Sequence, residues 1–194
     1  MKTNLFSGVP SEIVFLLEEK SARSLLNSLL PRILPGIKCI CIPHQGMREL
    51  QQKIPEKLRE WRTPGARFVV LHDQDDGDCK LLKSKLLKLC AQGGRSDAIV
   101  CITCRELEAW YWGDLEAVAK IYPRFKPQNI KNREKLRHTD AIMEPAEALE
   151  RRIPGFHKGK TAKEIGQHMN LDNNNSPSFQ HFIKKVRIVA GLNL

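Results

Sequence analysis

The sequence contains no apolar run that approaches the roughly 20 residues a membrane-spanning helix needs. Its first residues, MKTNLFSGVPSE, lack the continuous apolar core of a signal peptide. The 194 residues are 41% hydrophobic, which is ordinary for a globular protein and is enough for one core, or one core with a small appendage. We therefore expect a cytoplasmic protein that does not enter a membrane.

A second cysteine pair is also missing. Cys101 and Cys104 have the CxxC spacing, but without another pair or a nearby histidine this spacing is weak evidence for zinc. Four of the six cysteines lie in apolar, strand-like stretches, where a reduced thiol behaves as a small hydrophobe. We expect buried thiols rather than a zinc site.

Acidic residues are scarce towards the C-terminus. Residues 1–119 hold 17 Lys and Arg against 15 Asp and Glu, whereas residues 120–194 hold 15 against 7, so most of the net charge of +10 lies in the second part. A basic region of this kind fits a polyanionic partner, nucleic acid first, although a solvated charged surface has the same composition.

Apolar runs alternate with amphipathic segments through the first two thirds of the chain. This alternation predicts an α/β fold with a mostly parallel four-stranded sheet flanked by helices. The expected strands are 12–18, 37–42, 67–72 and 98–103. The first expected helix begins at Ser21 and is stopped by Pro31 and Pro35-Gly36. The others run from 47 to 61, with an interruption near Pro55, and cover 80–89 and 106–122.

From Pro123 onward, prolines divide the chain into short helical pieces, expected at 128–137, 145–152, 161–169 and 178–190. We therefore expect an α/β domain over residues 1–122 and a basic helical C-terminal region over residues 123–194 that packs on it.

Carboxylates follow three of the expected strands. Glu18 and Glu19 end the first, the stretch VVLHDQDDGDC carries Asp73 and Asp75 directly after the third, and Glu106 and Glu108 follow the fourth. In an open parallel sheet the carboxyl ends of the strands form the ligand-binding edge, so all three segments deliver acid to one place.

Clustered carboxylates repel one another unless a cation neutralises them. Oxygen ligands favour Mg²⁺ or Mn²⁺ over zinc, and a pair of such ions is the arrangement used in phosphodiester cleavage. A calcium-binding EF-hand starting at Asp73 is excluded, because its sixth position is Asp78 instead of glycine and its twelfth is Ser84 instead of glutamate.

The order of these motifs resembles the Toprim domain found in topoisomerases, primases and the overcoming-lysogenization-defect (OLD) nucleases. More closely, the chain resembles a bacterial Toprim-like family known only as a domain of unknown function. The matching stretches are FLLEEKSARSLL, FVVLHDQDDGDCKLLKSKL, CRELEAWYWGDL and, less closely, KGKTAKEIGQHM with SPSFQHF.

This resemblance implies a role for each matching residue. Glu18 would be a metal ligand or general base, Asp73 and Asp75 a metal-binding pair, and Glu108 with Glu106 the acids for a second metal. Lys158, in a basic loop, would neutralise the scissile phosphate. Toprim domains usually have glycine after the glutamate, whereas this chain has Glu19, so either Glu18 or Glu19 could be the ligand.

Plainer interpretations exist for several of these residues. Glu106 and Glu108 would suit the positive end of a helix without binding metal, and on a regular helix two residues so spaced cannot share a face. The aromatic run from Trp110 to Trp112 could stack on bases, but core packing is the simpler expectation. His44 ends the second strand at the same edge and is expected to be a turn histidine.

The combined expectation is a Mg²⁺- or Mn²⁺-dependent nuclease that cleaves DNA or RNA. The resemblance further implies an effector of anti-phage defence that works with a separate ABC- or SMC-like ATPase, since the sequence has no GxxxxGK[ST] phosphate loop. Two alternatives remain open: a signalling receiver phosphorylated on Asp73, and a degenerate Toprim module that binds without catalysis.

Overall fold

The computed structural model describes residues 8–130 and 138–192. Its centre is a sheet of four parallel strands in the order β2-β1-β3-β4. The strands are β1 (Ile13–Leu17), β2 (Cys39–Pro43), β3 (Arg67–Asp73) and β4 (Ile99–Thr103). β1 and β3 are apolar and buried on both faces, which is typical of the interior of a parallel sheet. The predicted α/β fold is thus confirmed.

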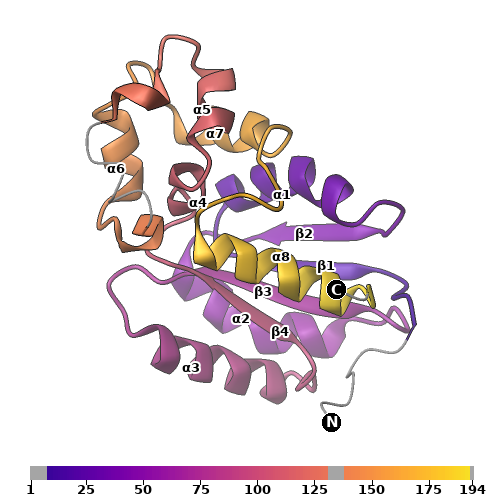
Figure 1. The fold of residues 1–194 in the computed structure, drawn as a ribbon. Coiled ribbons are helices and arrows are strands. Elements are labelled where there is room, and N and C mark those ends of the chain that lie inside the picture. The colour runs from indigo at the N-terminus through magenta and orange to yellow at the C-terminus, as the bar shows by residue number, and fades with distance from the viewer. Residues whose placement is uncertain (1–7, 131–137, 193–194) are drawn as a thin grey trace.

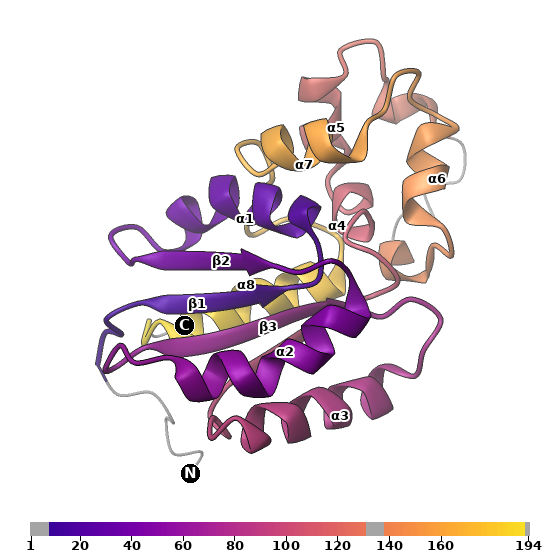
Figure 2. The same cartoon turned by 180° about the vertical axis from the view of Figure 1, so that it is seen from behind.

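Helices cover both faces of the sheet (Figures 1 and 2). α2 (Met47–Glu60) and α3 (Cys79–Gln92) pack side by side on one face, over the side chains of Val14, Leu16 and Val70. α1 (Lys20–Ile33) and α8 (Pro177–Val189) cover the other, over Phe15 and Leu71. Because side chains alternate along a strand, each strand supplies both cores.

The remaining helices are short. They are α4 (Ala109–Trp112), α5 (Leu115–Ile121), the 3₁₀ turn η1 (Pro127–Asn129), α6 (Pro145–Glu150) and α7 (Lys158–Ile165). α4 and α6 lie beyond the carboxyl ends of the strands, and α7 packs along α1 (Figures 1 and 2). The helix expected at 128–137 falls mostly outside the described residues. In the part of the chain that is described, no helix is long and apolar enough to cross a membrane.

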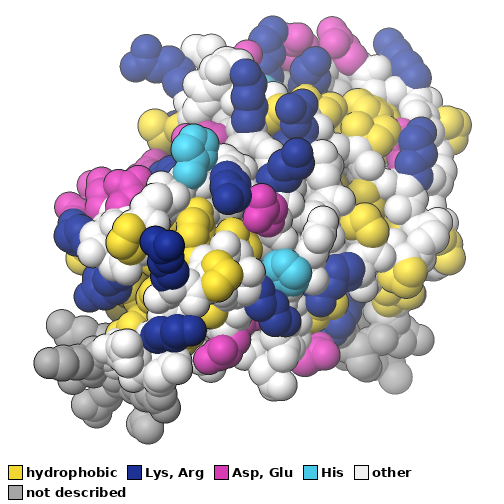
Figure 3. Space-filling view, turned by 90° about the horizontal axis from the view of Figure 1, so that it is seen from above, with side chains coloured by type: hydrophobic (Ala, Val, Ile, Leu, Met, Phe, Trp, Pro, Cys, Tyr) yellow, Lys and Arg dark blue, Asp and Glu magenta, His cyan; other side chains and the backbone are white. Residues whose placement is uncertain are grey.

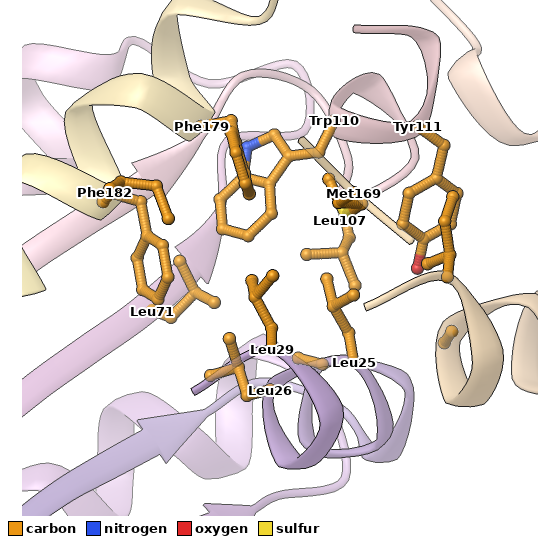
Figure 4. Close-up of a cluster of buried hydrophobic side chains, with 14 of the residues drawn as sticks. Leu25, Leu26, Leu29, Leu71, Leu107, Trp110, Tyr111, Met169, Phe179 and Phe182 are labelled. Carbon is orange, nitrogen blue, oxygen red and sulfur yellow. The ribbon is translucent and has the colours of Figure 1, made fainter. Parts of the chain in front are cut away.

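The C-terminal helix shares the core of the sheet. Trp110 packs against Phe179 and Phe182 of α8, with ring centroids 5.2 and 5.0 Å apart, and its indole nitrogen donates a hydrogen bond to Ser178. Figure 4 shows these rings above the leucines of α1 and beside Leu71 of β3. The aromatic run after β4 is therefore core, as the simpler interpretation held.

One predicted helix was wrong. The expected helix 106–122 is divided into α4 and α5, and at the division the Gly113 carbonyl accepts a hydrogen bond from the Asn175 amide at 2.8 Å. Asp114 then starts α5 by accepting a hydrogen bond from the Ala117 amide.

The expected proline breaks in the first two helices were also wrong. α1 continues past Pro31 and ends at Ile33, just before the second expected stop at Pro35-Gly36, and α2 runs through Pro55 without interruption. A proline removes one backbone donor, but both helices bury an apolar face along their length, and in α2 this face includes Leu50, Ile54 and Leu58.

Candidate active site at the carboxyl edge of the sheet

Glu18 and Asp73 meet where β1 and β3 end. Leu17 is paired with Leu71 in the sheet, so Glu18 continues one step beyond this pair, beside His72. Glu18 is 9% exposed, and its Oε2 atom accepts a hydrogen bond from the Asp73 amide at 3.1 Å. Two of the sequence-predicted residues are therefore brought into direct contact.

The Asp73 side chain lies on the opposite face of the sheet from Glu18. Asp73 is paired with Thr103 of β4, and the Thr103 hydroxyl donates a hydrogen bond to its carboxylate. Burial raises the pKa of Asp73 well above its usual value; the Thr103 bond opposes this shift, and the nearby charges of Glu18, Glu108 and Asp75 add to it.

Glu19 and Glu18 are placed differently. Glu19 precedes α1, is exposed, and its Oε2 accepts a hydrogen bond from the Ser21 hydroxyl at 3.2 Å. Burial raises the pKa of Glu18, although neighbouring His72 lowers it, and the charges of Asp75 and Glu19 raise it further. Of the two glutamates, Glu18 is the one that contacts Asp73, and Glu19 contributes negative charge from the rim.

Asp75 lies in an exposed turn that is tied to the segment after β4. Its φ of 51° is in the left-handed region, as is the φ of 63° at Arg105. The Asp75 amide donates to the Arg105 carbonyl at 3.0 Å, and the Arg105 guanidinium contacts Asp76 at 2.9 Å. The two strand-end loops therefore hold one another, and the Asp75 carboxylate remains exposed at the edge.

The other two acids of the loop, Asp76 and Asp78, have structural explanations. Asp78 caps α3 by accepting hydrogen bonds from the amides of Lys80 and Leu81, both at 2.8 Å. Asp76 forms the exposed ion pair with Arg105. Neither residue is needed to explain the buried acidic cluster.

Glu106 and Glu108 both face Lys158. The Lys158 ammonium is 3.8 Å from Glu106 Oε2 and 3.8 Å from Glu108 Oε2. The expected helix starts later than predicted, so both glutamates precede α4 and the spacing of a regular helix does not apply to them. Lys158 is the first residue of α7 and not part of a loop, a second correction.

Glu108 is the most deeply buried glutamate at this edge of the sheet. It is 2% exposed, and burial raises its pKa to about 7; Lys158 lowers the pKa, whereas Glu106 and Glu19 raise it. Burial lowers the pKa of Lys158, but the charges of Glu108, Glu106 and Glu19 outweigh this effect and leave it above its usual value. The site therefore pairs one ammonium group with an excess of carboxyl groups.

The carboxyl groups act on one another but do not form a closed cage. Among residues 8–130 and 138–192, no three Asp, Glu, His or Cys side chains converge closely enough to hold a metal ion. The donor set nevertheless fits a hard divalent cation, because it consists of carboxylate oxygens, and burial together with neighbouring carboxylates raises the pKa values of these groups. Binding would require side-chain rotation at the rim.

Three buried polar groups at or near this edge were not identified as site residues from the sequence. His72 is 1% exposed and contacts Glu18, and Thr103 contacts Asp73. The Tyr111 hydroxyl is buried without a hydrogen-bond partner, and burial raises its pKa, with further contributions from Glu108 and Asp73. His72 and Thr103 could have been noticed as polar residues inside strands otherwise rich in apolar side chains.

His44 is more buried than a turn histidine usually is. It is 6% exposed; its Nδ1 is 2.8 Å from the Leu17 carbonyl, and its Nε2 has no partner. The cysteines at the CxxC spacing are free thiols: Cys101 is buried in β4, and Cys104 is half-buried.

Fold and site together define an α/β protein whose parallel sheet presents buried carboxyl groups at its carboxyl edge. The chain belongs to the family described as "Domain of unknown function (DUF4276)", whose model matches residues 17–187. The expected membership in a family of unknown function is thus confirmed. No curated protein matches the chain.

One solved structure is similar to this chain. It is the C-terminal region of the OLD protein from Xanthomonas campestris pv. campestris, which is 16% identical, with a TM-score of 0.48 over 91% of this chain and 95% of the other. Similarity at this level assigns no activity to the present chain.

Proposed function

We propose that this protein is a nuclease that cleaves phosphodiester bonds of nucleic acid with the help of Mg²⁺ or Mn²⁺. The observation that carries the proposal is that separate segments bring the carboxyl groups of Glu18, Asp73 and Glu108 to one edge of the sheet, where the charges of Glu18 and Glu108 both act on Asp73. All three have raised pKa values, since burial disfavours their charged forms. A fold gains nothing in stability from such a cluster, which instead suits a bound cation.

The residues that would hold the cation are those at the strand ends. Glu18, Asp73 and the exposed Asp75 form one side of the site, and Glu106 and Glu108 form the other. When bound, the ion would supply Lewis acidity towards a phosphoryl oxygen and lower the pKa of a coordinated water.

The chain's own residues contribute positioning and charge. Thr103 fixes the Asp73 carboxylate through its hydroxyl, and His72 contacts the carboxylate of Glu18. Lys158 carries a positive charge 3.8 Å from Glu106 and Glu108, where it would also attract a phosphate. Glu108, whose pKa is about 7, can hold or release a proton near neutral pH.

Nucleic acid is the proposed substrate because unpaired positive charge surrounds the edge strand β4. α3 contains four lysines and no acid, and in the described residues none of the four forms an ion pair: Lys80, Lys83, Lys85 and Lys88. Lys184 and Lys185 of α8 lie near Lys83, since all three depress the pKa of His181, for which burial is the largest cause.

A second face is also rich in cations. Figure 3 looks down on the side that carries α5 and α7, and Lys and Arg side chains are spread over it with fewer Asp and Glu among them. Both surfaces fit the electrostatic attraction of a polyanion.

The biological role that we propose is that of an effector in anti-phage defence, acting in the cytoplasm together with a separate ABC- or SMC-like ATPase. The support is the sequence resemblance described above and the absence of a phosphate loop from the chain. When this protein and such an ATPase are expressed in the same cells, the two should purify as a complex. Cleavage at the full rate without the ATPase would contradict the need for one.

Cleavage assays on the purified protein test the proposed activity. Single- and double-stranded DNA and RNA are incubated with Mn²⁺ or with EDTA, using wild-type protein, Asp73→Asn and the matched control Asp76→Asn. Asp76 is an exposed acid of the same loop whose pairing is with Arg105. We expect Mn²⁺-dependent cleavage that Asp73→Asn abolishes and Asp76→Asn retains. Cleavage that survives both EDTA and Asp73→Asn would contradict the metal mechanism.

A further inference from the structure

A chain of hydrogen bonds runs from the surface of α3 to His72, whose ring lies against the carboxylate of Glu18. Lys85 Nζ is 2.6 Å from Gln51 Oε1, and Gln51 Nε2 is 3.0 Å from His72 Nε2. On the other side of the imidazole ring, His72 Nδ1 is 3.1 Å from Glu18 Oε2. The four residues come from α3, α2, β3 and the end of β1, and His72 is 1% exposed.

The direction of each hydrogen bond follows from the first. An ammonium group can only donate, so Lys85 fixes the oxygen of the Gln51 amide towards itself and the NH₂ group towards His72. His72 Nε2 must then accept, which leaves the proton on Nδ1. The Nδ1–H group donates to the Asp73 carbonyl oxygen and also lies 3.1 Å from Glu18 Oε2, where its positive end stabilises the carboxylate.

The consequence falls on Glu18. Its Oε2 atom accepts a hydrogen bond from the Asp73 amide and lies 3.1 Å from His72 Nδ1, so this oxygen is enclosed by two protein N–H groups. We infer that His72, held in one tautomer by Gln51 and Lys85, is a positioning residue that fixes Glu18 Oε2 and leaves Oε1 to serve the cation. This inference rests on the proposed function, because it assigns a purpose to the oxygen that remains.

The sheet explains why the support comes from this side. His72 and Val70 point to the same face because side chains alternate along β3, and that face is the one covered by α2 and α3. Asp73 points to the other face and has its own support in Thr103. The two acids therefore reach the edge from opposite faces of the sheet, each held by a different partner.

Calorimetric titration with Mn²⁺ alone tests the role of His72. His72→Leu removes the donor at similar volume, whereas the side-chain amide of His72→Asn can replace the Nδ1 proton. We expect His72→Leu to weaken Mn²⁺ binding about 10- to 100-fold, as loss of a partner behind a metal ligand does, and His72→Asn to restore most of it. Unchanged Mn²⁺ affinity in folded His72→Leu would overturn the inference.

Gln51→Leu removes the partner of His72 Nε2 and provides a second test if His72→Leu does not fold. Gln51 is partly exposed, and its neighbour Gln52, exposed on the same helix, provides the matched control Gln52→Leu. We expect Gln51→Leu to weaken Mn²⁺ binding and Gln52→Leu to leave it unchanged. Equal affinities in the two variants would contradict a role for the chain of hydrogen bonds.

A metal-free measurement separates failure of this inference from failure of the proposed function. Long-range ¹H–¹⁵N spectra of wild-type protein report which His72 nitrogen carries the proton. We expect the proton on Nδ1, with a mixture of tautomers in Gln51→Leu. A proton on Nε2 in the wild type would overturn the inference, whereas a wild type with the proton on Nδ1 that binds no Mn²⁺ would defeat the proposed function alone.

Discussion

The buried carboxyl group of Glu108 predicts an unusual pH dependence of stability in the metal-free protein. In the folded state its pKa is about 7, against 4.5 for a free glutamate, because burial disfavours the charged form. A raised pKa means that folding takes up a proton. The contribution to stability is therefore fully present below about pH 4.5 and is lost as the pH rises through about 7.

The size of the effect follows from the shift. About 2.5 pKa units, at 1.36 kcal/mol each, correspond to about 3 kcal/mol in total, of which about 2 to 3 kcal/mol is lost between about pH 5 and about pH 8. Glu18 and Asp73 also have raised pKa values and act in the same direction. A bound divalent cation should remove this loss, because it stabilises the charged carboxylates.

Urea denaturation in EDTA, at about pH 5 and about pH 8, measures this effect. Glu108→Gln keeps the shape of the side chain and removes the titration. The difference in free energy of unfolding between this variant and the wild type should therefore be about 2 to 3 kcal/mol larger, in favour of the variant, at about pH 8 than at about pH 5. Glu116→Gln, an exposed change on α5, is the matched control and should show no such difference. An effect of Glu108→Gln that is equal at both pH values would refute the reasoning.

Four further outcomes are expected. Lys158→Met should reduce the rate of cleavage about 100-fold but leave Mn²⁺ binding as tight or tighter, since a cation beside the acids is lost; an unchanged cleavage rate would count against its role. Asp78→Ala should lower the free energy of unfolding by about 1 kcal/mol, because it removes the cap of α3, while Asp76→Ala should change it by less than about 0.5 kcal/mol in the same urea titration. Trp110→Ala should lower the free energy of unfolding by about 3 to 5 kcal/mol in the same urea titration, because it removes the ring that packs against α8. A loss below about 1 kcal/mol would contradict the packing of α8 on the core.

The parts of the fold that were predicted correctly are those encoded by local patterns. The apolar runs ending at Leu17 and Leu71 indicate buried parallel strands, and the general rule for such sheets then places Glu18 and Asp73 at one edge. Both steps use only neighbouring residues and the geometry common to all parallel sheets. The contact between the two acids, through the Asp73 amide, confirms that they meet at this edge.

The parts that were missed depend on contacts between distant segments. The division of α4 from α5 lies where the Gly113 carbonyl accepts a hydrogen bond from the Asn175 amide, more than 60 residues away, and no local pattern encodes this contact. His72 is a similar case: its polarity inside an apolar strand is a local signal, but its partners Gln51 and Lys85 are identified only when α2 and α3 pack together.

The pairing of Lys158 with Glu106 and Glu108 lies between these cases. The family resemblance suggested a role for the lysine, but only the fold brings α7 to within 3.8 Å of both glutamates. Which carboxylates are buried, and so have raised pKa values, is likewise a property of the packed structure and not of the sequence motif.

Anomalous scattering from crystals grown with Mn²⁺ tests the central claim most directly. We predict a manganese peak at the strand ends, bonded to carboxylate oxygens of Glu18 and Asp73, that is absent from crystals of Asp73→Asn grown under the same conditions. Wild-type crystals that show no peak between these two side chains, at a Mn²⁺ concentration that supports cleavage, would contradict the account.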